Sequence, residues 1–237
     1  MQRSNSFVSA IIVAAGSGTR MNMEKNKMYI DVGAKPLLAR TIQVFQESSL
    51  IDEIILVTGS GDIVFCKQHI IDWYDLNKVK KIVAGGKERQ NSVYNGLCEV
   101  CERTDVVLIH DGARPFINDE IIKNSIDAAV LYGAAGVAVP VKDTIKVSDE
   151  EAYIKDTPDR KYLWAIQTPQ SFKYDIVLNA HRRAVEDGYI GTDDAVLVER
   201  MGHRMKLIMG SYYNIKITTM EDIAFANAIV ENMDKGL

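Results

Sequence analysis

Apolar residues along this chain occur in short runs that alternate with longer stretches of helical periodicity. Short runs bounded by turn residues are typical of buried strands, whereas apolar residues at every third or fourth position are typical of amphipathic helices. The short runs predict strands at Ser9–Ala14, Glu53–Thr58, Lys81–Val83, Val106–His110, Gly136–Val139 and Leu163–Ile166. The periodic stretches predict helices at Pro36–Glu47, Ile63–Trp73, Arg89–Glu102, Asp119–Tyr132, Tyr174–Asp187, Thr192–Met201 and Met220–Met233. This alternation indicates a three-layer α/β fold in which helices cover both faces of a mostly parallel, twisted sheet.

The stretch Lys142–Asp159 interrupts this alternation. Its charged, short pattern predicts a β-hairpin, with strands at Thr144–Val147 and Ala152–Lys155 around a turn at Ser148–Glu151. A hairpin with so little apolar surface is not stable alone, and a second subunit is the simplest surface for it to pack on. We therefore expect one domain, residues 1–237, from which residues 142–160 protrude as an arm used in dimerisation.

Three polar motifs directly follow predicted strands. They are the Gly-rich run that begins at Val13, the pair Gly85-Gly86 and the pair His110-Asp111. In parallel α/β sheets the ligand crevice lies beyond the carboxyl ends of the strands. We therefore expect these motifs to meet at one edge of the sheet and to form the binding site.

The first motif is rich in glycine and basic residues. Gly16 and Gly18 precede Arg20, and lysines follow. Glycine removes the Cβ atom that would keep a phosphate chain away from backbone N–H groups, and arginine and lysine bind phosphate oxygens. The motif predicts a triphosphate site, with an ordinary strand-to-helix turn as the alternative. It is not a Walker loop, because its glycines are only two apart, and Met21 replaces the third glycine of a dinucleotide fingerprint.

The second motif leads from Gly85-Gly86 into a predicted helix that contains Ser92. The glycines would let a flat base lie against the backbone, and the serine hydroxyl can hydrogen-bond to a base edge. The alternative is an ordinary turn in which Arg89 and Asn91 are solvated residues at the start of the helix.

The third motif places Asp111 at the end of a strongly apolar strand. A carboxylate at this position can hold a divalent cation against nucleotide phosphates, although a turn-capping role is the alternative. Gly112 leaves room for a ribose, and Arg114 could brace the loop or bind anions. We expect His110 to pack in the strand, because no acyl-transfer or proton-transfer constellation surrounds it.

Three later segments contain further candidates. Trp164–Phe172 resembles a loop fixed by proline and amides, and Gly191–Asp194 is typical of a helix N-cap. Lys216 lies between two isoleucines on an expected strand that leads into the last helix. This lysine could serve the site or could lie on the exposed side of an edge strand.

Composition narrows the possible partners. The 237-residue chain has a formal net charge of −4 and no basic stripe, which argues against sequence-independent nucleic-acid binding. No apolar run reaches the roughly 18 residues that a membrane span requires, and the first residues do not form a secretory signal, so we expect a cytoplasmic protein. Cys98 and Cys101 form a C-x-x-C with no second pair and no nearby histidine, and we expect buried or half-buried helix thiols there.

The ordered set of motifs resembles one family of Rossmann-like nucleotidyltransferases, the 2-C-methyl-D-erythritol 4-phosphate cytidylyltransferases. The motifs are A-A-G-x-G-x-R-M, G-G-x-x-R-x-x-S-V, H-D-x-A-R-P, P-V-x-D-T-I-K, D-R-x-x-L-W-x-x-Q-T-P-Q-x-F, T-D-D-A and N-I-K-I-T. They span nearly the whole chain. The resemblance implies transfer of the CMP group of CTP to methylerythritol phosphate, with release of pyrophosphate, in the non-mevalonate isoprenoid pathway.

The resemblance also assigns roles to residues. Arg20 and Lys27 would hold the triphosphate, and Lys216 would stabilise charge near the α-phosphate. Asp111 would contact the ribose and Mg²⁺. Further nucleotide-binding positions would be Ala14, Ala15, Gly16, Gly18, Gly86, Ser92 and Gly112.

For the second substrate, the resemblance implies binding by Arg114, Thr168 and Thr192. In this family the hairpin crosses to the partner of a homodimer, which implies that Thr144 and Arg160 act in the neighbouring active site. Arg160 would join Arg20, Lys27 and Lys216 as a catalytic residue.

The sequence departs from the family pattern at several positions. Asn26-Lys27-Met28 replaces the usual P-K-Q, and Lys25 competes with Lys27 for its assigned role. Gly112 replaces an alanine, and Lys87 occupies a position that is often acidic. A ribitol 5-phosphate cytidylyltransferase shares most of the motifs and is the alternative, although Asp159-Arg160 and the T-D-D-A motif resemble the methylerythritol enzymes more closely.

Overall fold

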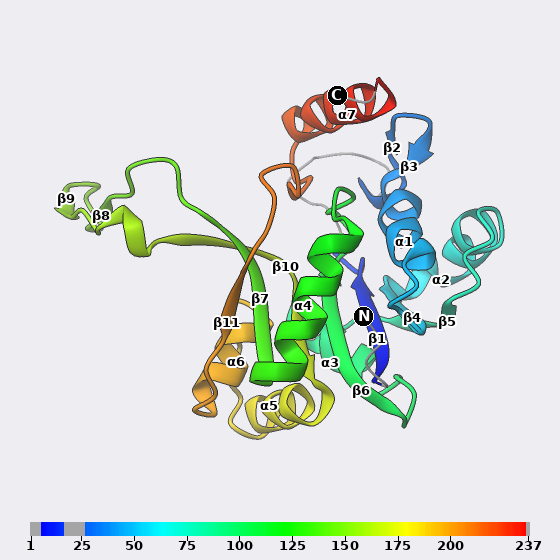
Figure 1. Cartoon of the computed structure of the whole chain (residues 1–237), viewed down its shortest axis with the longest axis horizontal. Helices are drawn as coiled ribbons and strands as arrows, with labels where there is room; N and C mark the ends of the chain where they lie inside the picture. The colour runs from blue at the N-terminus through cyan, green and yellow to red at the C-terminus, as the bar shows by residue number, and fades with distance from the viewer. Residues whose placement is uncertain (1–5, 17–26, 236–237) are drawn as a thin grey trace.

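The computed structural model describes residues 6–16 and 27–235. Its main sheet has the strand order β11-β7-β10-β6-β1-β4-β5 (Figure 1). All neighbouring strands are parallel except β10, which is antiparallel to both β6 and β7. The sheet strands are β1 (Phe7–Val13), β4 (Glu53–Thr58), β5 (Val79–Ala84), β6 (Thr104–Asp111), β7 (Ala134–Pro140), β10 (Trp164–Lys173) and β11 (Lys206–Met209). The prediction of a mostly parallel α/β sheet is confirmed.

Helices cover both faces of this sheet, and the last of them lies beyond one end of it (Figure 1). They are α1 (Leu37–Glu47), α2 (Ile63–Cys66), which continues as a π-helical turn at Lys67–Ile71, α3 (Arg89–Leu97), α4 (Asp119–Tyr132), α5 (Tyr174–Glu186), α6 (Asp194–Arg200) and α7 (Met220–Asp234). Short 3₁₀ turns lie at Lys27–Tyr29, Ser60–Asp62 and Arg160–Tyr162. Local sequence signals fix several ends, because Asn118 caps α4 and Thr219 forms a capping box with Asp222 at α7.

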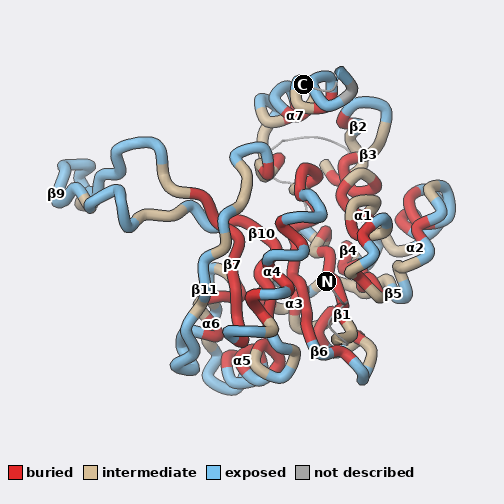
Figure 2. Tube along the Cα trace, in the orientation of Figure 1, coloured by how far each residue is buried: buried red, intermediate tan, exposed pale blue. Residues whose placement is uncertain are grey.

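Alternate side chains of β1 face two separate cores. Ala10 and Ile12 belong to a buried cluster that also includes residues of α1, α2, α4 and α7, whereas Ile11 belongs to a second cluster with residues of α3, α5 and α6. This division follows from the period of two along a strand. The two cores establish the three layers, and Figure 2 shows the inner strands of the sheet as the most deeply buried part of the molecule.

A small hairpin and a long arm lie outside the main sheet. The small hairpin pairs β2 (Asp31–Val32) with β3 (Lys35–Pro36), and Asn227 Oδ1 of α7 accepts a hydrogen bond of 2.8 Å from Gly33 N beside it. The arm pairs β8 (Val147–Ser148) with β9 (Ile154–Asp156) and projects far from the sheet (Figure 1). Both of its strands are exposed throughout.

Several predicted boundaries are wrong. The segment around Lys216 is an extended loop and not a strand, because its backbone pairs with no sheet strand there and Ile217 N instead donates to Ala113 O. The third predicted helix ends at Leu97, so Cys98 is an exposed C-cap residue and Cys101 lies beyond the helix. The sixth begins at Asp194, since Asp193 is its cap. Edge strand β11 was not predicted.

Candidate active site

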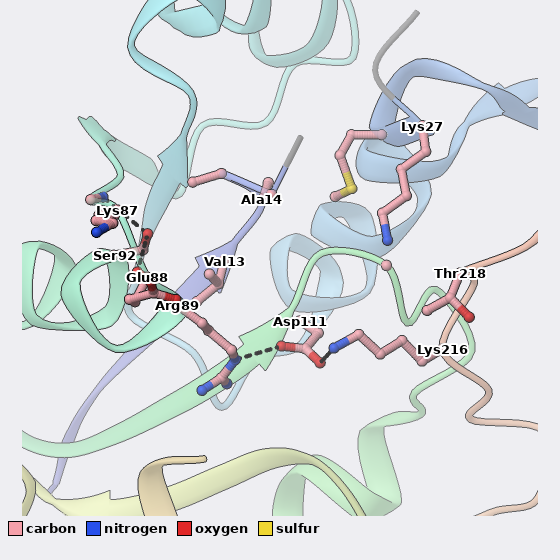
Figure 3. Close-up of a pocket in the computed structure, with 15 residues that line it drawn as sticks. Val13, Ala14, Lys27, Lys87, Glu88, Arg89, Ser92, Asp111, Lys216 and Thr218 are labelled. Carbon is pink, nitrogen blue, oxygen red and sulfur yellow. Dashed lines mark hydrogen bonds and ion pairs between the residues drawn. The ribbon is translucent and has the colours of Figure 1, made fainter. Parts of the chain in front are cut away.

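A cavity of about 310 Å³ lies at the carboxyl ends of β1 and β6 (Figure 3). Its walls also include the start of α3, the 3₁₀ turn at Lys27 and the loop before α7. The lining residues are Val13, Ala14, Ala15, Gly16, Lys27, Met28, Gly86, Lys87, Glu88, Arg89, Ser92, Asp111, Ala113, Lys216 and Thr218. The structure therefore brings the three strand-end motifs together, as the sequence predicts.

Close backbone approach shapes one wall of this cavity. A Cβ atom on Gly85 would lie 2.2 Å from Ala15 Cβ, so only glycine allows the ends of β1 and β5 to approach so closely. Ser92 Oγ accepts a hydrogen bond of 3.0 Å from Gly86 N and donates one of 3.2 Å to Glu88 O. Ser92 thus holds the loop between β5 and α3 in shape, in addition to lining the cavity.

Two lysines distant in sequence point into the cavity from the opposite wall (Figure 3). Lys27 Nζ donates to Ile217 O at 3.2 Å, so the 3₁₀ turn that begins at Lys27 is held against the loop that contains Lys216. Lys216 Nζ lies 2.7 Å from Asp111 Oδ2, and its side chain is 38% exposed. The alternative in which Lys216 lies on the exposed side of an edge strand is wrong.

Asp111 is the charge centre of the site. Besides Lys216, its carboxylate meets Arg89 Nε at 3.1 Å through Oδ1 and Arg114 Nε at 3.9 Å through Oδ2. Burial alone would raise the pKa of Asp111, but the charges of Arg89 and Lys216 outweigh burial and hold this pKa well below its usual range. Asp111 is therefore an ionised carboxylate at neutral pH.

Arg89 links Asp111 to a second buried carboxylate. Arg89 Nη1 lies 2.7 Å from Asp194 Oδ2, and His181 Nε2 lies 3.1 Å from Asp194 Oδ1. Burial would lower the pKa of Arg89, but Asp194 and Asp111 together raise it. The alternative in which Arg89 is a solvated residue at the start of the helix is wrong. Its two partners lie 22 and 105 residues further along the chain.

A chain of hydrogen bonds behind the cavity supports Asp111. Asp111 N donates to Thr168 Oγ1 at 3.0 Å, Thr168 Oγ1 is 3.1 Å from His110 Nδ1, and His110 Nε2 is 3.0 Å from Arg114 O. Burial lowers the pKa of His110 to about 4, so the ring is neutral and its Nε2–H donates to the carbonyl. His110 packs in its strand, as predicted, and Thr168 uses its hydroxyl inside the protein.

The remaining candidates lie outside the cavity lining. Arg114 is largely buried and donates from Nη1 to Asn214 O at 2.7 Å. A Cβ atom on Gly112 would lie 2.6 Å from Met28 Cε and 3.2 Å from Val13 O. Met28 therefore occupies part of the space beside Gly112, and the assignment of this glycine to the ribose stays a prediction.

Thr192 is exposed in the turn before α6, and Thr144 and Arg160 are exposed along the arm and at its base. A shallow groove at the base is lined by Pro140, Val141, Asp159, Arg160, Lys161 and Trp164. Gly18, Arg20 and Lys25 lie outside the described residues.

The sequence interpretation missed Asp194 and His181 as parts of the site. The only available signals were the second carboxylate of the T-D-D-A motif and a histidine among the apolar positions of α5. Neither signal identifies a partner, because the pairing depends on how α3, α5 and α6 pack together.

The strand ends supply glycine-rich backbone and an ionised carboxylate, and a turn and a loop add one lysine each; this arrangement on a mostly parallel sheet is typical of an α/β nucleotidyltransferase. Residues 8–232 match the family model for 2-C-methyl-D-erythritol 4-phosphate cytidylyltransferase. The chain belongs to this family.

Relatives and solved structures agree with this membership. The enzyme of that name from Caldanaerobacter subterraneus is 55% identical over 92% of this chain and 96% of its own length, and the one from Alkaliphilus oremlandii is 50% identical over 98% of both. The crystal structure of 4-diphosphocytidyl-2C-methyl-D-erythritol synthase from Anaerococcus prevotii superposes with a TM-score of 0.84 at 36% identity, covering 96% of this chain and all of that one. The Thermus thermophilus cytidylyltransferase gives a TM-score of 0.78 at 29% identity, covering 95% and 99%.

Within the described residues, no helix is long and apolar enough to cross a bilayer.

Proposed function

We propose that the chain transfers CMP from CTP to 2-C-methyl-D-erythritol 4-phosphate in isoprenoid precursor biosynthesis. A phosphate oxygen of methylerythritol phosphate bonds to the α-phosphorus of CTP, the bond from that phosphorus to the β-phosphate oxygen breaks, and pyrophosphate leaves. The observation that carries the proposal is the convergence of Lys27, Lys216 and Asp111 on one cavity in a member of this family.

The lysines supply positive charge where the reaction concentrates negative charge. Phosphoryl-type transfers depend on positioning and electrostatic stabilisation, with little covalent chemistry for the protein to perform. We assign Lys27, together with Arg20, to the triphosphate and Lys216 to the α-phosphate. Binding of the triphosphate would draw the Lys216 ammonium away from Asp111, because the triphosphate and the Asp111 carboxylate compete for this ammonium group.

The wall beside α3 fits the nucleoside. Backbone of Ala14, Ala15 and Gly16 lines the cavity next to Gly86, and Ser92 fixes the loop that contains this glycine. We assign this wall to cytosine recognition, because exposed backbone groups can hydrogen-bond to a base edge.

Mg²⁺ is the cofactor that we assign to Asp111. Among the described residues no group of three or more His, Cys, Asp or Glu could hold a metal ion. One ionised carboxylate beside a triphosphate site still fits Mg²⁺, which is usually held by one or two carboxylates together with substrate phosphates. When bound, the ion would neutralise charge on the triphosphate.

The second substrate would bind between this cavity and the arm of a second subunit. Ile145, Val147, Tyr153 and Ile154 of the arm are exposed apolar residues without a core of their own. We propose that residues 142–160 pack on a partner subunit within a single-domain homodimer, so that Thr144 and Arg160 reach the partner's site. We also assign binding of the second substrate to Arg114, Thr168 and Thr192. Thr168 would act indirectly, through its hydrogen bonds to Asp111 and His110.

The experiment measures pyrophosphate release with CTP and Mg²⁺, comparing methylerythritol phosphate with ribitol 5-phosphate. We expect a strong preference for methylerythritol phosphate. Preference for ribitol 5-phosphate would keep the chemistry and replace the substrate, and no release with either would reject the proposal.

A further inference from the structure

Arg89 lies where its own helix does not favour a cation. It is the first residue of α3, and the positive end of a helix dipole disfavours positive charge. Two carboxylates outweigh this cost, with Asp111 at the end of β6 on Nε and Asp194 at the start of α6 on Nη1. The guanidinium is a planar fork, so binding at two of its nitrogens fixes its orientation as well as its position.

Among the described residues, Arg89 is the one that links Asp194 to the cavity. The Asp194 side chain is 1% exposed and does not line the cavity. His181 binds its other oxygen, and Gln170 Oε1 accepts from its backbone N at 3.1 Å. Burial would raise the pKa of Asp194, but Arg89 and His181 lower it. Asp194 is therefore a fixed anion behind Arg89.

The two oxygens of Asp111 consequently meet two different cations. Oδ1 faces Arg89, which Asp194 holds from behind. Oδ2 faces Lys216 at 2.7 Å, a half-exposed side chain on a loop that the triphosphate can attract, and lies farther from the buried Arg114, at 3.9 Å from its Nε. We infer that Asp194, supported by His181, is a positioning residue that locks Arg89 onto Asp111 Oδ1, so that only Oδ2 exchanges its partner when the nucleotide and Mg²⁺ bind. This inference rests on the proposed function.

The test compares Asp194→Asn with Asp193→Asn. Asp193 is the adjacent carboxylate. It caps α6 with Oδ1, accepts a hydrogen bond from Gln170 Nε2 with Oδ2, and makes no ion pair with Arg89. Asparagine is an equally good cap, so this variant disturbs the Gln170 contact but keeps the anion behind Arg89. The dissociation constant of CTP is measured by calorimetry with Mg²⁺ and with EDTA, and kcat and KM are measured alongside.

We expect Asp194→Asn to weaken CTP binding in Mg²⁺ by about tenfold, as for other residues that orient a metal-binding carboxylate. Binding in EDTA should change by less than about twofold, and Asp193→Asn should match the wild type in both conditions within about the same factor.

A double-mutant cycle separates positioning from general stability. If Asp194 acts through Arg89, Arg89→Gln with Asp194→Asn should bind CTP in Mg²⁺ no more weakly than Arg89→Gln alone. Arg89→Lys is the second variant if Asp194→Asn does not fold, because lysine keeps the charge but cannot bind both carboxylates as a fork. Arg89→Lys should show the same loss of CTP affinity in Mg²⁺ as Asp194→Asn.

The outcomes are distinct from those for the proposed function. Folded Asp194→Asn or Arg89→Lys with wild-type CTP binding in Mg²⁺ overturns the inference, as do additive losses in the cycle or an equal loss in Asp193→Asn. A wild-type chain that neither binds CTP nor releases pyrophosphate overturns the proposed function instead.

Discussion

The cavity at the sheet edge and the β8–β9 arm are both rich in charge, but their charges lie in opposite environments. Asp111 and Asp194 are buried and meet cations from other elements, whereas the ion pair between Asp159 and Lys161 at the arm is exposed and local. Buried charges must be paired and are held in place, while exposed pairs contribute little. The charges of the sheet edge are thus held in place within one chain, whereas the arm has no buried partners of its own, in line with our proposal that it packs on a second subunit.

The largest expected effect is at the cavity. Lys216→Ala should lower kcat/KM by about 100-fold or more, near 3 kcal/mol of transition-state stabilisation, because it removes a cation from a confined site. Steady-state pyrophosphate release measures the loss. Lys206→Ala, an exposed lysine on β11, is the matched control and should behave as wild type. Near-normal kcat/KM in Lys216→Ala would remove this lysine from the reaction.

The next experiment connects the two regions. Lys27→Ala and Arg160→Ala should each be nearly inactive, and their equimolar mixture should recover about a quarter of wild-type activity. Half of the dimers would then be mixed, and each mixed dimer would contain one intact site.

Subunit exchange is verified by mass spectrometry of differently tagged chains. Exchange without recovery of activity would show that Arg160 serves its own subunit or none.

The third effect is a pH dependence of stability, which we expect from buried His110 behind the cavity and not from the exposed arm. The pKa of His110 is lowered to about 4 by burial, against about 6.5 in the unfolded chain. Between these values the unfolded chain binds a proton that the native chain does not. The stabilising contribution of His110 to the free energy of unfolding is therefore complete above pH 6.5 and is lost as the pH falls toward 4. From pH 7 to pH 5 we expect a loss of about 2 kcal/mol in the free energy of unfolding.

Urea unfolding at both pH values measures this loss. His110→Gln should remove this part of the pH dependence, whereas His203→Gln, at an exposed position, should retain it. If His110→Gln loses as much free energy of unfolding between pH 7 and pH 5 as the wild type, the assignment of a neutral, buried ring is contradicted.

The smallest effect is expected in the arm. Tyr153→Ser should change the free energy of unfolding of the monomer by less than about 0.5 kcal/mol, because Tyr153 is 69% exposed and has no core to leave. Dimer dissociation, followed by analytical ultracentrifugation, should become about tenfold easier, as for loss of an interface aromatic. Tyr132→Ser on α4 is the exposed control, with no expected effect on the dimer. Equal dimer affinities for the two variants would place the interface elsewhere.

The same contrast explains what the sequence could predict. Buried strands such as β4 and amphipathic helices such as α4 were predicted with their observed bounds, because burial imposes a local pattern. Edge strand β11 has no buried residue and leaves no such pattern. The loop around Lys216 imitates a strand because its isoleucines pack inward while its backbone bonds elsewhere.

The candidate site divides along similar lines. Lys27, Lys216, Gly86 and Asp111 were predicted and line one cavity, since strand ends and glycines mark the sheet edge in the sequence. The partnership of Arg89, Asp194 and His181 was not predicted, because each residue is ordinary in its own segment. Only the packing of α3 against α5 and α6 makes them neighbours.

The hydrogen bond from Lys27 to the carbonyl of Ile217 has a consequence for synthesis on the ribosome. The cavity takes walls from residues 13–16 and 27–28 and from residues 216–218, so most of the sheet can be translated and can emerge before its two sides meet. Until Thr218 has left the exit tunnel, the nascent chain lacks Lys216 at this cavity and Asp111 lacks its closest cation. Completion of the nucleotide site therefore follows translation of the last sheet strand, and a chain stalled before this loop would not carry the assembled site.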